Sequence, residues 1–319
     1  MRSIKSRLLL KGYKNKQSII TILLALVVMA GQAQQTMTVK DSITNEPIPF
    51  VSVYFGNDTG GYTDEKGAIA IPNEAEQIWL SHICYETKSI SKITADSQTI
   101  ILVPKSINLD EVAISARIPK RIKTTEVGSM KAKTQTKHKG ANGFEMALFI
   151  PYDSTWTETP YIHSILASLD YSTHYLVFTE IKTPIYATLR FDLRLPDAKT
   201  NAPKDESIIG GGIILPSSQK LGKDGISLIN PIPFPRTGVF VVVEWITTVQ
   251  VSESCNLIPS LNMSLDEKEN RTWNKKTFRG MDWMQEHNEP AYQNEEAKVF
   301  YKGRTPSAKL GLKISKKEI

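Results

Sequence analysis

Residues 39–71 read VKDSITNEPIPFVSVYFGNDTGGYTDEKGAIAI, and this stretch decides the fold. Residues 50–55 are mostly β-branched or aromatic, as strands prefer, and Val51 and Val53 share one face because side chains alternate along a strand. Residues 64–67 form a tight turn, in which Asp64 accepts backbone hydrogen bonds and Gly67 adopts a positive φ. Short strands separated by such turns predict an all-β unit.

Further segments continue this pattern toward the C-terminus. They are rich in β-branched and apolar residues and are separated by turn-forming residues. The predicted strands are residues 68–71, 78–83, 87–93, 99–103 and 109–114.

Five motifs in residues 34–116 carry a resemblance to a known family. They are Lys40-Asp41, PIPFVSV at 47–53, GYTDEKG at 61–67, SHICY at 81–85 and LDEV at 109–112. The segment resembles the carboxypeptidase regulatory-like domain, a small transthyretin-like β-sandwich common in envelope proteins of the Bacteroidetes. Cys84 stands where that family usually has glycine. The resemblance implies a structural or docking module.

Residues 1–33 have the pattern of a signal peptide. Six basic residues and no acidic one precede an apolar run at 19–30, and Gly31-Gln32-Ala33 offers small residues for cleavage. The apolar run is shorter than the roughly 20 residues of a membrane span. Gln32 stands where a lipoprotein would need cysteine. We therefore expect an exported protein that is not a lipoprotein, located in the periplasm, at the outer membrane or on the cell surface.

The net charge of +6 comes from the predicted signal peptide. The chain has 39 basic and 33 acidic residues, and removing the six basic residues of 1–33 leaves 33 of each. Binding to nucleic acid needs a sustained basic surface. A neutral mature chain therefore argues against a nucleic-acid partner.

Residues 117–143 are predicted to be a basic linker between two domains. Eight lysine and arginine residues stand there against the single Glu126, with almost no apolar periodicity. Such a segment buries too little surface to offset the entropy of ordering it. It is either a solvated connector or, over residues 117–139, a strip that contacts an anionic membrane surface.

Residues 144–319 are predicted to form a second, larger antiparallel β-sandwich. Residues 186–195 alternate almost strictly, which predicts one packed face and one wet face carrying Arg190, Asp192 and Arg194. Residues 238–246 are nearly all apolar and predict a strand buried on both sides, and 308–314 predict a closing strand. This half is similar to a jelly-roll-like sandwich found after the regulatory-like module in Bacteroidetes proteins, a resemblance that implies architecture only.

Catalytic, metal and cofactor motifs are absent from the sequence. None of the five histidines is followed by glutamate three residues later, as the first part of a carboxypeptidase zinc site requires, and no serine-hydrolase elbow or Walker loop occurs. The acidic residues Asp58, Asp64 and Glu65 do not have the spacing of a calcium loop. We therefore predict no catalytic residues, no metal and no cofactor.

Two further groups of residues leave alternatives open. Cys84 and Cys255 are the only cysteines, and they either pair across the domains in an oxidising compartment or stay separate as small apolar residues. Aromatic residues in loop-like surroundings either contact a ligand or close the sandwich edges. These aromatic residues are Trp156, Tyr161, Trp273, Trp283 and Tyr292.

The sequence therefore predicts an exported, non-catalytic cell-envelope protein that binds a protein or a glycan. The alternative is a hydrolase or a glycan-binding protein with its site in the C-terminal sandwich. A hydrolase site would combine His163 or His174 with Asp170 and Glu180.

Overall fold

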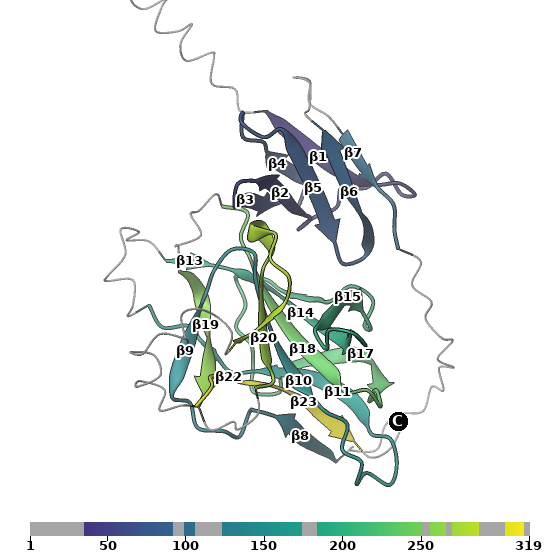
Figure 1. Cartoon of the computed structure of the whole chain (residues 1–319), viewed down its shortest axis with the longest axis vertical. Helices are drawn as coiled ribbons and strands as arrows, with labels where there is room; N and C mark the ends of the chain where they lie inside the picture. The colour runs from purple at the N-terminus through teal and green to yellow at the C-terminus, as the bar shows by residue number, and fades with distance from the viewer. Residues whose placement is uncertain are drawn as a thin grey trace, which may run out of the picture.

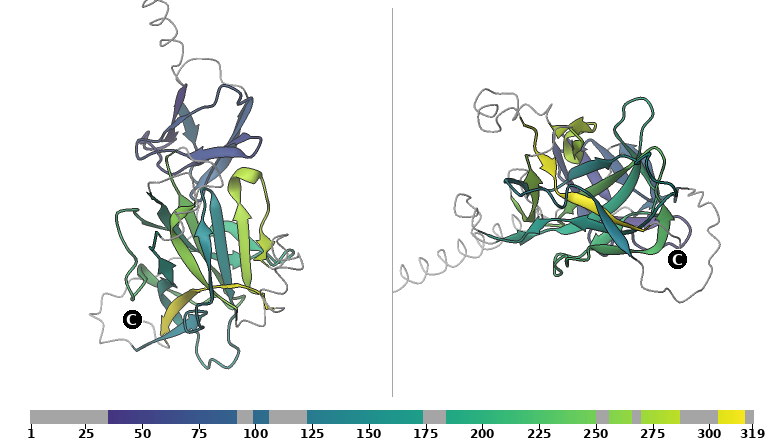
Figure 2. Two further views of the ribbon diagram at one scale, coloured as in Figure 1. Left: turned by 90° about the vertical axis from the view of Figure 1, so that its left-hand side faces the viewer. Right: turned by 90° about the horizontal axis from the view of Figure 1, so that it is seen from below.

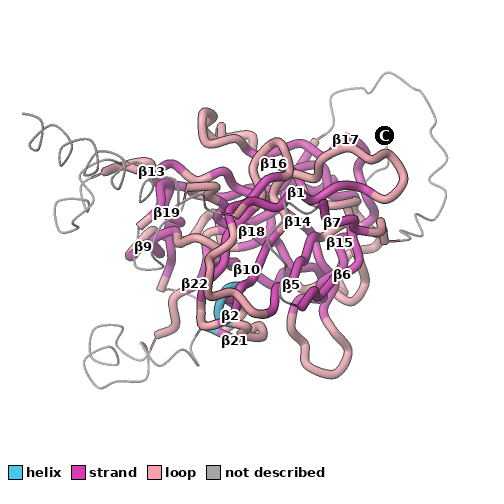
Figure 3. Tube along the Cα trace, turned by 90° about the horizontal axis from the view of Figure 1, so that it is seen from above, coloured by secondary structure: helices cyan, strands magenta, loops and turns pink. Residues whose placement is uncertain are grey.

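The computed structural model describes residues 35–91, 99–105, 123–173, 184–249, 256–265, 270–286 and 304–315. These residues form two β-structured bodies stacked along the long axis of the molecule (Figures 1 and 2). The prediction of an all-β protein is confirmed. Figure 3 shows strands and loops throughout, with one short helical turn, η2 (Thr277–Arg279), in the described parts of the chain. The predicted signal peptide and the predicted strand 109–114 lie outside them.

The N-terminal body contains seven strands in two sheets. Five of them agree to within two residues with the predicted segments 50–55, 68–71, 78–83, 87–93 and 99–103. The short glycine-rich strand at residues 59–62 was not predicted, because its sequence TGGY has no apolar alternation. The strands are β1 (Thr36–Asp41), β2 (Ser52–Gly56), β3 (Thr59–Tyr62), β4 (Ala68–Ala70), β5 (Gln77–His82), β6 (Tyr85–Ser91) and β7 (Thr99–Leu102).

One sheet of this body has the order β4-β1-β7 and the other β3-β2-β5-β6. Their facing sides share one core, to which β1 contributes Val39, β2 contributes Val53 and β5 contributes Leu80. The turn after β3 forms as expected, since Asp64 Oδ1 accepts hydrogen bonds from the backbone of Lys66 and Ala68. The body is a small β-sandwich.

The C-terminal body is larger and is built from three sheets. One has the order β15-β14-β18-β10-β20-β21, with β16 also paired to β14; the second is β17-β11-β23-β8; the third is β12-β19-β13, with β9 and β22 also paired to β19. The strands are β8 (Thr124–Gly128), β9 (Thr136–Gly140), β10 (Phe144–Ile150), β11 (Tyr161–Ala167), β12 (Leu169–Asp170), β13 (Ile185–Tyr186), β14 (Thr188–Pro196), β15 (Pro203–Ser207), β16 (Ile213–Leu215), β17 (Ile226–Pro233), β18 (Val239–Ile246), β19 (Leu257–Ser264), β20 (Thr272–Lys276), β21 (Met284–Gln285), β22 (Ser307–Ala308) and β23 (Leu310–Ser315).

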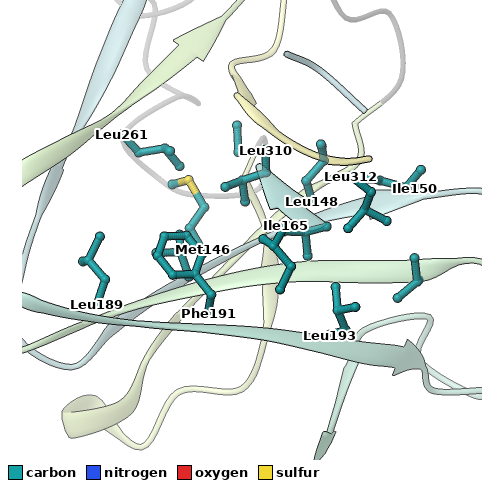
Figure 4. Close-up of a cluster of buried hydrophobic side chains, with 14 of the residues drawn as sticks. Met146, Leu148, Ile150, Ile165, Leu189, Phe191, Leu193, Leu261, Leu310 and Leu312 are labelled. Atoms are coloured by element: carbon teal, nitrogen blue, oxygen red, sulfur yellow. The ribbon is translucent and has the colours of Figure 1, made fainter. Parts of the chain in front are cut away.

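The core of this body lies between the seven-stranded sheet and the other two sheets. Met146, Phe191 and Leu193 point from the first layer toward Ile165 and Leu310 of the second (Figure 4). Strand β18 is buried along its whole length, as its apolar sequence predicted. The predicted closing strand is also present as β22 and β23, with Leu310, Leu312 and Ile314 buried.

The prediction that 117–143 is an unstructured linker is wrong from residue 124 onward. Strand β8 pairs with β23, and β9 pairs with β19, so both belong to the second sandwich. In β9 the lysines Lys137 and Lys139 are exposed, whereas the intervening His138 stacks on Phe144 with ring centroids 4.4 Å apart. Exposed and buried residues therefore alternate along β9, but the sequence did not reveal this because the exposed residues are basic and the buried ones are not large and apolar.

The prediction of a wet outer face on 186–195 is also wrong. Strand β14 is buried on both faces, and Arg190, Asp192 and Arg194 are 1–6% exposed. Segments far away in sequence, including the N-terminal sandwich, cover this face. A pattern confined to one strand does not reveal such a cover.

Candidate functional site

The outer face of the seven-stranded sheet carries a row of charged residues. The register places Arg190 of β14 opposite Glu244 of β18, Glu244 opposite Glu145 of β10, and Glu145 opposite Lys275 of β20. Directly paired residues point to the same face, so the four side chains lie side by side across four strands. Both glutamates are 5% exposed. The row is therefore largely removed from water.

Ion pairs offset the cost of burying these charges. Nη1 of Arg190 lies 3.2 Å from Oε2 of Glu244. Nη1 of Arg194 lies 3.0 Å from Oε2 of Glu145, an ionic contact without hydrogen-bond geometry, and Nε of Arg194 donates to Oδ2 of Asp192 at 2.8 Å. Arg194 thus forms ion pairs with two carboxylates. Because an unpaired buried charge is strongly destabilising, the cluster depends on this residue.

The N-terminal sandwich covers one end of the row. The hydroxyl of Tyr62, at the end of β3, donates a 2.6 Å hydrogen bond to Oε1 of Glu244, and Nη2 of Arg190 donates to the carbonyl of Phe50 at 2.8 Å. The ring of Tyr62 packs edge-on against Phe278 of η2, with centroids 5.2 Å apart. Both partners of the Arg190–Glu244 pair are therefore bonded to the other domain.

Burial dominates the electrostatics of this contact. It raises the pKa of Glu244, although Arg190 opposes the shift, and it raises the pKa of Tyr62 well above the usual value. Burial also disfavours the charged form of Arg194, but Glu145 and Asp192 outweigh it and leave the pKa raised. The cluster is closed and its groups are bonded to one another. Its chemistry is suited to joining the domains rather than to turning over a substrate.

A second contact joins the domains through the turn between β5 and β6. The thiol of Cys84 lies 3.7 Å from the carbonyl oxygen of Gly210, and a side chain at Gly211 would overlap the Cys84 sulfur. Burial raises the pKa of the Cys84 thiol. Cys84 is a free cysteine. Cys255, its partner in one of the two alternatives left open by the sequence, lies outside the described residues.

We expect His82 in this turn to make stability depend on pH. Burial, together with Arg190 and Lys105, lowers the pKa of His82 to about 3, and its Nδ1 accepts a 3.2 Å hydrogen bond from the backbone of Cys84. In the unfolded chain the His82 imidazole has its ordinary pKa of about 6.5, so between pH 6.5 and pH 3 the unfolded chain binds a proton that the folded chain does not. The contribution of His82 to the free energy of unfolding is therefore complete above pH 6.5 and is lost as the pH falls toward 3. Urea unfolding between pH 7.5 and pH 4.5 should show this loss, and His82→Gln should reduce it. A His82 pKa near 6.5 by NMR would contradict this expectation.

The structure places the predicted ligand-contact aromatic residues in separate locations. Trp273 and Trp283 pack against one cluster with Phe240 on the outer face of the seven-stranded sheet. The ring of Trp283 also lies 5.8 Å from the guanidinium of Arg194 and 5.9 Å from Nζ of Lys275. Trp156 instead packs edge-on against Tyr152 and Phe234 beside the main core, and Tyr161 is half-buried in β11. Tyr292 lies outside the described residues.

The two described residues of the predicted hydrolase site, His163 and Asp170, form hydrogen bonds with other residues and not with each other. Nε2 of His163 lies 2.6 Å from Oγ of Ser315, and burial lowers the pKa of His163. Asp170 pairs with Lys137 and accepts hydrogen bonds from Ser172. Its pKa is lowered, because these bonds outweigh the effect of burial. His174 and Glu180 lie outside the described residues. Within the described ranges, no group of three or more His, Cys, Asp or Glu side chains is placed to hold a metal ion.

The sequence contained a signal for the buried row that single-strand patterns did not reveal. Glu244 interrupts the apolar run VFVVVEWI, and Glu145 interrupts FEMALFI. An acidic residue within a strand that is otherwise apolar predicts a buried, paired charge. Which cations pair with these glutamates depends on strand order, which the sequence did not give.

Comparisons with protein-family models, curated proteins and solved structures found no match. In the described part of the chain no helix is long and apolar enough to cross a membrane.

Proposed function

We propose that this chain is an exported, non-catalytic protein of the cell envelope whose two β-sandwiches act as one docking unit for a protein or a glycan. The observation that carries the proposal is the set of contacts from Tyr62 and Phe50 to the buried Glu244–Arg190 pair. These contacts use buried ionisable groups to fix one domain on the other. A fixed pair of domains presents a composite surface of constant shape, which reduces the entropy lost on binding.

The motifs in residues 34–116 support assignment of the N-terminal sandwich to the carboxypeptidase regulatory-like family. The pattern of residues 1–33 supports export. The family assignment and the export of the chain are therefore parts of this proposal, and so is a jelly-roll-like fold for the C-terminal body. The exposed Lys131 and Lys133, beside β8 and β9, support contact with an anionic membrane surface.

The outer face of the seven-stranded sheet also offers a surface for the partner. Trp273 and Trp283 are half-buried there, beside the half-buried Phe149. Aromatic side chains are enriched at binding surfaces because they bury a large area at little entropic cost. The ring of Trp283 also lies beside Lys275, whose ammonium pairs with Asp205.

The competing proposal is a hydrolase that uses His163 and Ser315. The 2.6 Å contact between them is the observation that favours it. Ser315 is only 3% exposed, however, so its hydroxyl is poorly placed to attack a substrate. A panel of peptide and glycan substrates would decide: turnover that disappears in His163→Ala would establish the hydrolase and refute the docking proposal.

Crosslinking in intact cells, followed by mass spectrometry, tests the docking function. We expect a mature N-terminus at Gln34 and crosslinks to one envelope protein or glycan complex. The crosslinks should weaken in Gly60→Val, in which the added side chain would overlap Phe278 at the domain contact, and persist in Gly222→Val, whose position is open. An uncleaved N-terminus, or crosslinks unchanged in Gly60→Val, would count against the proposal.

A further inference from the structure

We infer that the β5–β6 part of the outer face of the N-terminal sheet β3-β2-β5-β6, which the C-terminal body leaves open, is a binding platform for a neutral carbohydrate, centred on Trp79. This inference rests on the proposed binding function and names its ligand class. Strand β5 runs between β2 and β6. Its alternate residues Ile78 and Leu80 are buried in the core, whereas Trp79 is on the opposite face and 37% exposed.

The platform is a pair of aromatic rings on neighbouring strands. The register places Trp79 directly opposite Tyr54 of β2, and the ring centroids are 5.4 Å apart with planes inclined by 37°. Tyr54 packs in turn against the cluster of Tyr62 and Phe278 at the domain contact. Trp79 belongs to none of the hydrophobic clusters formed by the described residues. The Tyr54 ring is thus held by the domain contact, while part of the Trp79 ring remains free.

The residues around Trp79 are short, polar and uncharged. Ser89 of β6 lies directly opposite Trp79, and Gln77 and Ser81 lie on the same face of β5. All three are exposed. Serine side chains are too short to cover an indole ring, so a ligand can stack on the ring while its hydroxyl groups bond to the serines and the glutamine.

This composition favours a sugar over the other partner classes. Ser is depleted in the cores of protein–protein interfaces, where Arg is enriched, and no charged side chain stands among Gln77, Trp79, Ser81 and Ser89. Trp283, by contrast, lies beside the charged side chains of Arg194 and Lys275, which pair with Asp192, Glu145 and Asp205. A sugar ring has an apolar C–H face and a hydroxyl edge, which match the indole and its polar neighbours.

Isothermal titration calorimetry of the purified full-length protein with maltohexaose, cellohexaose, xylohexaose and mannohexaose tests the inference. At least one neutral hexasaccharide should bind and quench tryptophan fluorescence, whereas a heparin hexasaccharide should not bind at this site. Trp79→Ala should weaken binding by about tenfold or more. Ser89→Arg, which leaves the core and Trp79 intact, should also weaken it. Tyr186→Ala removes an exposed aromatic residue of the other sandwich and should leave the affinity unchanged.

Two results would overturn the inference, and they affect the proposed function differently. If a hexasaccharide binds but its affinity depends on Trp273 or Trp283 and not on Trp79, glycan binding stands and this site is wrong. If none of the four neutral sugars binds, the inference is also wrong, while crosslinks to an envelope protein would still support docking.

Discussion

Replacing Arg194 with methionine is expected to lower the free energy of unfolding by about 3–5 kcal/mol. Methionine fills much of the space but removes the cation that pairs with both Asp192 and Glu145. Asp192 is 1% exposed and keeps hydrogen bonds from Ser207 and the Leu193 backbone, yet these do not neutralise its charge. Urea unfolding of the variant and the wild-type protein measures the difference.

An exposed ion pair provides the matched control, because it shows how much stability is lost when a pair is broken without leaving a buried charge unpaired. Nζ of Lys313 lies 2.7 Å from Oδ1 of Asp224, whose side chain is 96% exposed. Lys313→Met should therefore cost only about 0–1 kcal/mol. Combining Arg194→Met with Asp192→Asn and Glu145→Gln should recover much of the lost stability, since the unpaired charges are then gone. Equal losses for Arg194→Met and Lys313→Met would show that the buried cluster is not a main source of stability.

Gly60→Val is expected to separate the two sandwiches. Gly60 lies in β3 against η2, and a Cβ there would overlap the ring of Phe278. The hydrogen bond from Tyr62 to Glu244, two residues away, should be lost with the packing. The thiol of Cys84 should then react with a maleimide severalfold faster, because it loses the cover of Gly210 and Gly211 and its burial-raised pKa falls.

The measurement needs a background in which only one thiol reacts. Cys255→Ser provides it, and Gly222→Val is the control because a side chain at Gly222 meets nothing within 4 Å. An alkylation rate in Gly60→Val equal to that in Gly222→Val would mean that η2 and β3 do not hold the domains together.

The all-β class and most strands of the N-terminal sandwich could be predicted because apolar and polar residues alternate clearly along them, but the glycine-rich β3 could not. Strand β18 could be predicted because seven of its eight residues are apolar and require burial on both faces. The strands β8 and β9 could not. β8 reads TTEVG and has a single large apolar residue, Val127. The exposed face of β9 is basic, and its buried face carries His138 and Gly140 rather than large apolar residues. These two segments form strands because they pair with β23 and β19, which lie more than 100 residues away in the sequence.

The candidate site was beyond prediction for a related reason. The charges on residues 190–194 belong on a solvated face when the strand is considered alone. They become a buried cluster only because β18 and β10 bring Glu244 and Glu145 beside them and Tyr62 closes the end. The predicted aromatic residues Trp273 and Trp283 pack against one cluster on the outer face of the seven-stranded sheet, whereas Trp156 packs against the main core.

A disulfide between the two sandwiches tests the central claim, that they form one fixed unit, most directly. A side chain at Gly211 would overlap the sulfur of Cys84, so a cysteine there should come within bonding range despite the strain of a φ of +121°. With Cys255→Ser in the background, mild oxidation of Gly211→Cys followed by peptide mapping should recover almost all Cys84 linked to residue 211. Gly222→Cys should give no such link. Equal and slow crosslinking at the two positions would contradict a fixed docking of the domains.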